Sequence, residues 1–169
     1  MFYEWIIKLL GLGLLATIFF TSPQLDYQNN ILSVDAHLNT PITDEISNLV
    51  KTGCSFGIEY YVSIIHNESE VYSKTEIKEL IFDNNIYTIN NKKINSQMLQ
   101  DKMGELKFNF SNVIIKKNDS IQLFIRAKIQ NNEAFTESTK LKTSALWNYN
   151  TPLIKENYIF NGAKFISYQ

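Results

Sequence analysis

Hydrophobic and polar residues alternate along several stretches of the chain. The clearest alternation runs over residues 31–39, 54–66 and 121–129. Because successive side chains of a strand point to opposite faces, a period of two predicts strands with one buried face. In the third stretch this period places Ile125 on the apolar face and Arg126 on the polar face.

Further strands are predicted between and after these stretches. Residues 71–82 and 86–89 flank the turn sequence Asp-Asn-Asn and predict a hairpin. Residues 106–115 and 135–147 are also compatible with strands.

Two short helices are predicted among the strands. Thr43 is a suitable N-cap, an apolar stripe follows it, and Gly53 comes just past the expected end of the helix. A second helix is predicted to begin at Ser96 and to end near Gly104.

The predicted fold is mainly β: an antiparallel β-sandwich with one or two short helices, preceded by an N-terminal membrane-spanning or signal helix. Many strands without a regular strand–helix–strand alternation favour antiparallel sheets over parallel ones. The sandwich domain is expected over residues 31–150, after a polar linker at residues 23–30. Residues 151–169 are apolar enough to be ordered, but the pattern assigns no element to this C-terminal tail.

The N-terminal segment, residues 1–22, has the layout of an export signal or a membrane anchor. Its uncharged run follows Lys8 and ends before Pro23. The run is shorter than a standard span of about 20 residues, but extending it back past a snorkelling Lys8 makes it long enough to cross a bilayer. The first basic residue after the run is Lys51, so the rest of the chain is predicted to lie outside the cytoplasm.

Whether this segment is cleaved stays open from the sequence. Signal cleavage requires small residues at the last and third-last positions. Cutting after Thr21 or Ser22 leaves Phe19 or Phe20 third-last, which favours an uncleaved anchor over a cleaved signal. The predicted location is therefore the inner (cytoplasmic) membrane, with a single pass and the C-terminal domain outside the cytoplasm.

Composition is that of an ordinary globular domain and narrows the choice of partners. The formal net charge is −1 and Arg126 is the only arginine, so a nucleic-acid or phosphate site is not expected. Aromatic residues make up 13% of the chain, which agrees with a strand-rich fold. The abundance of Asn, Ile and Lys is interpreted as a genome bias without functional weight.

The sequence contains no glycine-rich phosphate loop and no HExxH, CxxC or GxSxG motif. The single cysteine, Cys54, is interpreted as a small buried hydrophobe, with a free thiol as the alternative. His37 and His66 are expected to face solvent, so no metal site is predicted. Acidic pairs such as Glu76 and Glu79 are expected on solvated surfaces. We predict no catalytic residue and no cofactor.

Aromatic pairs are the remaining candidates for a site. The alternating spacing of Phe108 and Phe110 favours the core over a stacking platform for sugars or single strands. Trp147 and Tyr149 follow the last clear strand and are the candidates for an exposed aromatic patch that binds a partner protein.

The order of elements also carries a family resemblance. The strand ILSVDAHL, a short helix, the strand SFGIEYYVSI, a hairpin, the strand IQLFIRAKI and a segment with Ser144 and Trp147 follow one another. This order resembles the domain-of-unknown-function 4390 family of bacterial exported proteins, in which an N-terminal hydrophobic segment precedes one β-rich domain. The resemblance implies a non-enzymatic envelope protein and carries over no functional residue.

Three functions are compatible with these features. The favoured hypothesis is a non-enzymatic, membrane-anchored envelope module that docks to a protein partner and binds no nucleic acid. The alternative is a binding module for a small apolar or lipid-like ligand held between the sheets, and the third is an Asp/Glu hydrolase. A filled core favours the first function, an enclosed apolar cavity the second, and two converging carboxylates the third.

Overall fold

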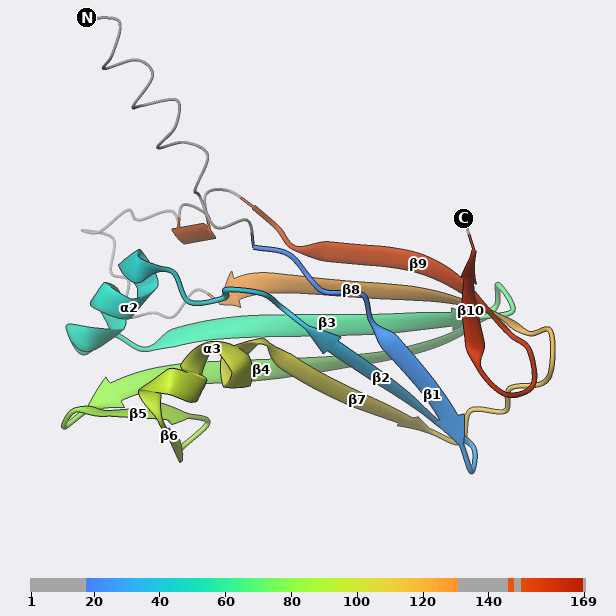
Figure 1. The fold of residues 1–169 in the computed structure, drawn as a ribbon, viewed down its shortest axis with the longest axis horizontal. Coiled ribbons are helices and arrows are strands. Elements are labelled where there is room, and N and C mark those ends of the chain that lie inside the picture. The colour runs from blue at the N-terminus through green and yellow to red at the C-terminus, as the bar shows by residue number, and fades with distance from the viewer. Residues whose placement is uncertain (1–17, 131–145, 148–149, 169) are drawn as a thin grey trace, which may run out of the picture.

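The computed structural model describes residues 18–130, 146–147 and 150–168. They form two antiparallel sheets, a small one of order β1-β2-β7 and a large one of order β10-β9-β8-β3-β4-β5-β6. The small sheet crosses the large sheet obliquely, and the helices lie at one end of both (Figure 1). The prediction of a mainly β fold with two antiparallel sheets and short helices is confirmed, whereas the N-terminal helix falls on residues outside those described.

The described strands and helices have these bounds. The small sheet contains β1 (Gln24–Gln28), β2 (Ile31–His37) and β7 (Glu105–Ser111). The large sheet contains β3 (Phe56–His66), β4 (Glu70–Asp83), β5 (Ile86–Ile89), β6 (Lys92–Ile94), β8 (Ser120–Gln130), β9 (Leu153–Phe160) and β10 (Phe165–Tyr168). The helices are α2 (Asp44–Lys51), the 3-10 turn η2 (Ser96–Met98) and α3 (Leu99–Gly104).

The central strand β3 supplies the middle of the core. It pairs along its length with β4 on one side and with β8 on the other. Alternate residues of β3 point toward the small sheet and are completely buried: Phe56, Ile58, Tyr60, Val62 and Ile64. The predicted apolar face of this strand is therefore confirmed, and it packs against the equally buried inner faces of β2 and β7.

The faces of β8 also follow the predicted alternation. Ile125 is completely buried, whereas Arg126 is half-buried on the other side of the sheet. The assignment of these two residues to opposite faces is confirmed, because the register pairs Ile125 with the buried Val62 and Arg126 with the half-buried Tyr61.

Three hairpins close on pairs of asparagines. Asn29-Asn30, Asn84-Asn85 and Asn90-Asn91 all have positive φ at both residues. Each pair forms the two-residue loop of an antiparallel hairpin, between β1 and β2, β4 and β5, and β5 and β6. Two positive φ values in such a loop define a type I′ turn, which asparagine tolerates better than most residues.

Two segments differ from their sequence-based descriptions. The expected linker at residues 23–30 contains β1, which pairs with β2 over five residues and is thus part of the small sheet. The C-terminal tail forms β9 and β10 at the edge of the large sheet, and β9 buries Ile154, Tyr158 and Phe160. β1 and β10 are short edge strands with weak alternation. In β9 the exposed apolar residues Leu153 and Ile159 obscure the alternation.

The helices close one end of the core as predicted. The Thr43 hydroxyl accepts a hydrogen bond from the Ile46 N–H at 3.3 Å and thereby caps α2. Ile46 and Val50 of α2 are completely buried, as is Met103 of α3. The helices therefore cover the core at the end of the sheets where β3 begins (Figure 1).

The last residues of the N-terminal hydrophobic segment belong to this domain. Ile18 and Phe20 are 3% and 9% exposed, and Phe20 forms an isolated bridge with Leu38. The amide of Asn150 donates to the Ile18 carbonyl at 2.6 Å. The expected boundary after Ser22 is therefore wrong, because residues from Ile18 onward pack with the core. Residues 1–17 lie outside the described residues, and within the described part no helix is long and apolar enough to cross a membrane.

Truncation tests this boundary. A chain that starts at Ile18 is expected to keep the core intact, whereas one that starts at Pro23 loses the burial of Ile18 and Phe20. Full burial of such side chains stabilises by about 1.5–3 kcal/mol each, so we expect the shorter chain to lose about 3–6 kcal/mol. Urea denaturation of the two chains measures the difference, and equal midpoints would place the boundary back at Ser22.

Candidate functional site

The large sheet has one face turned away from the small sheet, which we call the outer face. It comprises the residues of β3, β4, β8, β9 and β10 that alternate with the core residues. Eleven large apolar side chains are exposed among the described residues, and six of them are on the outer face. These six are Val71, Ile77, Leu153, Ile159, Ile166 and Tyr168.

The outer side of the small sheet has a different character. Apart from Ile31 at the start of β2, the residues of β1, β2 and β7 that point outward are polar or charged. They include Asp26, Ser33, Lys107 and Asn109. A solvated sheet face is normally polar in this way. The outer face of the large sheet therefore differs from the exterior of the small sheet, because it exposes large apolar residues.

Three half-buried side chains form the centre of the outer face. The rings of Tyr61 on β3 and Phe124 on β8 meet edge to face with centroids 6.1 Å apart. The guanidinium carbon of Arg126 lies 5.8 Å from the centroid of the Tyr61 ring, which is a cation–π contact. Tyrosine and arginine are enriched among the residues that dominate protein–protein binding energy. The cluster Tyr61–Phe124–Arg126 therefore has the composition of a binding centre.

Charges are distributed unequally around this centre. Arg126 and Lys155 contribute positive charge on β8 and β9, and no carboxylate lies within ion-pair distance of either among the described residues. The next outward residue of β8, Lys128, is paired with Glu59 of β3 at 2.9 Å. A carboxylate placed over Arg126 would form an ion pair that the neighbouring aromatic rings strengthen by excluding water.

The outer face is hollowed near the end where β3 meets β4. A depression of about 250 Å³ is lined there by residues of β3, β8, β9 and β10, with Ile65, Gln122, Asn157 and Tyr168 among them. The Gln122 amide donates to the Asn157 side chain at 3.0 Å and fixes the floor. Tyr168 is 45% exposed, so its ring forms an exposed wall of this depression.

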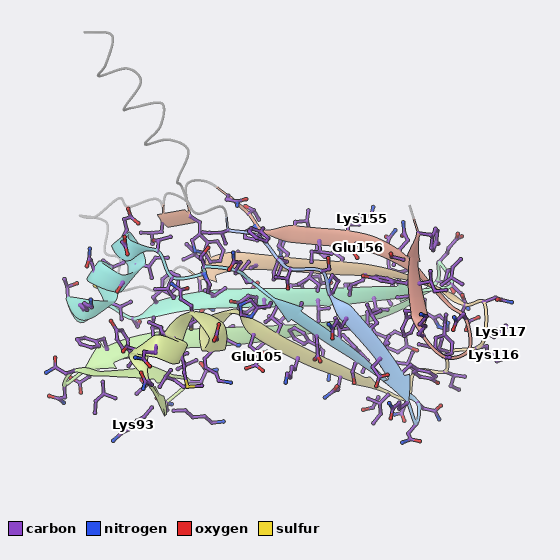
Figure 2. The ribbon with its side chains drawn as sticks, in the orientation of Figure 1. Lys93, Glu105, Lys116, Lys117, Lys155 and Glu156 are labelled. Atoms are coloured by element: carbon purple, nitrogen blue, oxygen red, sulfur yellow. The ribbon has the colours of Figure 1, made fainter. Side chains whose placement is uncertain are left out.

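A second hollow lies at the edge of the large sheet, beside the segment that leads into β1. It has a volume of about 700 Å³ and is lined by Ser22, Pro23, and residues of β9 and β10. Two charged residues of β9, Lys155 and Glu156, contribute to this lining (Figure 2). Burial and the neighbouring Glu156 raise the pKa of the Tyr158 hydroxyl, which stays protonated and donates to the Glu156 carboxylate. The lining is thus polar and charged rather than apolar.

His66 is buried, contrary to the prediction that it faces solvent. Its Nε2 lies 2.9 Å from the Asp119 carboxylate, and the whole residue is 5% exposed. The same carboxylate accepts the Lys116 N–H at 2.8 Å. Burial acts to raise the pKa of Asp119, but hydrogen bonds from the Lys116 N–H, His66 and Asn67 lower it below its ordinary value. This contact ties the end of β3 to the turn before β8.

The other histidine and the cysteine form no site with His66. His37 is half-buried on β2 in the small sheet, where its ring lies against Gly104 so closely that a Cβ there would be 3.0 Å away. Cys54 is half-buried, and the Thr52 hydroxyl lies 3.8 Å from its sulfur. Among the described residues, no three His, Cys, Asp or Glu side chains gather as metal ligands.

The buried lysine Lys78 has a structural role. Its ammonium donates to the backbone carbonyls of Lys102 and Glu105 and lies 5.8 Å from the centre of the Tyr60 ring. The Tyr60 hydroxyl donates to the Met103 carbonyl at 2.6 Å. Burial lowers the pKa of Lys78, and the nearby carboxylates of Glu76 and Glu105 offset part of this lowering. These donors satisfy carbonyls at the C-terminal end of α3.

Trp147 does not belong to an exposed patch. It is 2% exposed, and its indole N–H donates to the Pro41 carbonyl at 2.9 Å. The expectation of exposure is wrong because the ring fills the helical end of the core. Tyr149 lies outside the described residues. The outer face carries a half-buried aromatic cluster instead. Its signal in the sequence is the presence of Tyr61 and Phe124 among the residues that alternate with the core residues of their strands.

Comparisons with protein-family models, curated protein sequences and solved structures find no match to this chain. The resemblance to the domain-of-unknown-function 4390 family therefore stays a prediction, and the candidate site rests on the geometry of the outer face.

The His66–Asp119 contact generates a pH-dependent prediction. Since the pKa of Asp119 is lowered by folding, its ionised form stabilises the fold above its ordinary pKa of 3.8, and this stabilisation is lost as the pH falls through the folded-state value. Replacing Asp119→Asn is expected to cost about 1–3 kcal/mol at pH 7 and progressively less in acid. Urea denaturation between pH 3 and 7 measures the difference, with Asp26→Asn at an exposed site as the control. A cost that does not change with pH would contradict the role of the ionised carboxylate.

Proposed function

We propose that this chain is a non-enzymatic interaction module that docks a protein partner through the outer face of its large sheet. The observation that carries this proposal is the cluster Tyr61–Phe124–Arg126 on an outer face that also exposes six large apolar side chains. The exterior of the small sheet is polar by contrast. Exposed apolar patches rimmed by polar residues are typical of protein-binding surfaces. The partner is expected to present apolar side chains and, opposite Arg126, a carboxylate or an aromatic ring.

The alternative ligand-binding function receives less support. The hollow of about 700 Å³ opens at a sheet edge and is lined in part by Lys155, Glu156 and Ser167, which suits neither a lipid nor another apolar ligand. The facing interiors of the two sheets are filled with side chains of no or very low exposure. Packing of this kind favours a module that works through its surface.

We also propose that residues 1–17 hold the domain at a membrane, with the domain outside the cytoplasm. Support comes from the uncharged run after Lys8 and from the absence of basic residues between that run and Lys51. The packing of Ile18 and Phe20 into the core argues against cleavage after Ser22, which would remove two core residues, and it shortens the apolar run that is left for the membrane to residues before Ile18.

Cell fractionation tests the tether. The full chain is expected in the membrane fraction, and it should resist extraction by high salt because an apolar segment, rather than charge, holds it there. A chain that starts at Ile18 is expected in the soluble fraction with an unchanged unfolding midpoint. Recovery of the native protein in the soluble fraction, with an N-terminus beyond residue 17, would contradict an uncleaved anchor.

Photo-crosslinking in living cells tests the docking face. Benzoylphenylalanine at Phe124 in the full chain is expected to capture a protein, whereas the same group at Asn109 on the small sheet is not. Because arginine at the centre of an interface commonly contributes 2 kcal/mol or more, Arg126→Ala is expected to reduce the crosslinked yield about tenfold or more. The matched control is Lys107→Ala, which should leave the yield unchanged. Equal capture from both sheets would count against a dedicated face.

A further inference from the structure

We propose that the partner of the outer face is a second copy of this chain, packed face to face about a two-fold axis that runs parallel to the strands of the large sheet. This inference rests on the proposed docking function and names its partner. It follows from the charges, the register and the size of the outer face, and from the position of Ile18.

The charges of the outer face are self-complementary about such an axis. Positive residues lie on β8 and β9, where Arg126, Lys128 and Lys155 point outward, and negative residues lie on β3 and β4, where Glu59 and Glu79 point outward. An axis parallel to the strands, above the seam between β3 and β8, places the positive half of each copy over the negative half of the other. An axis across the strands would place the positive halves over each other, which electrostatic repulsion disfavours.

The register of β3 and β8 makes the match residue by residue. Within one chain, Glu59 is beside Lys128, Tyr61 beside Arg126, and Ser63 beside Phe124. The same axis sets each β8 residue opposite the β3 neighbour of the second copy. Lys128 then faces Glu59 of the second copy, Arg126 faces its Tyr61, and the large Phe124 faces its small Ser63. Twisted sheets pack with their strands about 30° apart, so this match applies to the rows near the axis.

The outer face has the size that a dimer needs. Four strands about 4.8 Å apart, over the ten residue pairs of β3 and β8, cover about 600 Å² of flat area. Side-chain relief adds to this figure, and stable interfaces bury about 800 Å² of accessible surface on each partner. Two sheets that pack face to face also bury the apolar residues Val71, Ile77 and Leu153, whose exposure in a single copy is otherwise unexplained.

The position of the N-terminal segment is compatible with the same axis. Ile18 is hydrogen-bonded to Asn150, three residues before β9 begins, so it lies at the end of the large sheet where the helices are (Figure 1). A two-fold axis parallel to the strands keeps this end of both copies on the same side of the dimer. Two chains held in one membrane require that arrangement.

Charge reversal in the full chain tests the proposal. The mass of the complex is measured by sedimentation equilibrium in density-matched detergent micelles. The unmodified chain is expected to contain two copies, and Glu59→Lys or Lys128→Glu alone is expected to weaken dimerisation at least tenfold, because each variant carries like charges on both sides of the interface. An equimolar mixture of the two variants is expected to recover dimers, because each contact then joins opposite charges.

The small sheet supplies a matched control. Glu105 and Lys107 form an exposed ion pair at 3.2 Å, so Glu105→Lys and Lys107→Glu make the same reversals away from the outer face. Both control variants should remain dimeric. If circular dichroism shows that either reversal on the outer face unfolds the chain, Ser73→Lys replaces it, because this exposed residue of β4 faces Lys155 of the second copy. It is expected to weaken dimerisation similarly.

Two results would overturn the proposal. A single chain at every concentration up to about 100 μM would exclude the dimer. A dimer that persists through all reversals on the outer face would place the contact elsewhere. Photo-crosslinking from Phe124 separates this failure from that of the docking function. Capture of a different protein by a monomeric chain overturns only the second copy as partner, whereas no capture by a monomeric chain overturns both proposals.

Discussion

The pairing of β3 on both of its edges is the constraint on which the rest of the structure depends. This strand joins β4 and β8 over almost its whole length and sends five completely buried side chains into the core. Because the register of a strand fixes which residues share a face, burying Tyr60 and Val62 necessarily turns Tyr61 and Ser63 outward. The core and the outer face are therefore two results of one register, and neither can shift without the other.

The sequence was sufficient for the core strands and insufficient at the edges. The alternation around Ile125 is long and regular, so the sequence alone predicts the buried face of β8. The edge strands β1 and β10 are short, and alternation over four or five residues is a weak signal. Asn84-Asn85 predicts a turn, and the same signal is present at Asn29-Asn30, where it marks the turn that makes β1 a strand rather than a linker.

The candidate site could be located only after the pairing partners of each strand were known. The sequence shows that Phe124 and Arg126 lie on the same face of β8, but it does not show that Tyr61 is beside Arg126. That proximity depends on a contact between strands separated by more than fifty residues, which periodicity does not encode. The same limit explains Trp147 and His66. Their burial depends on Pro41 and Asp119, which are distant in the chain.

The direct entry of the chain into the core at Ile18 has a consequence for how the domain would behave at a membrane. If residues 1–17 hold the domain at a membrane, as proposed, their direct connection to the core at Ile18 would confine the domain to a thin layer above the bilayer. Encounters between neighbours would then take place in two dimensions and in a limited set of orientations. Tethered sites meet at effective concentrations that reach the millimolar range, where even modest affinity produces substantial occupancy. An outer face with a moderate apolar area and few charges is adequate under those conditions. The buried packing of Ile18 and Phe20 thus bears on association as well as on folding.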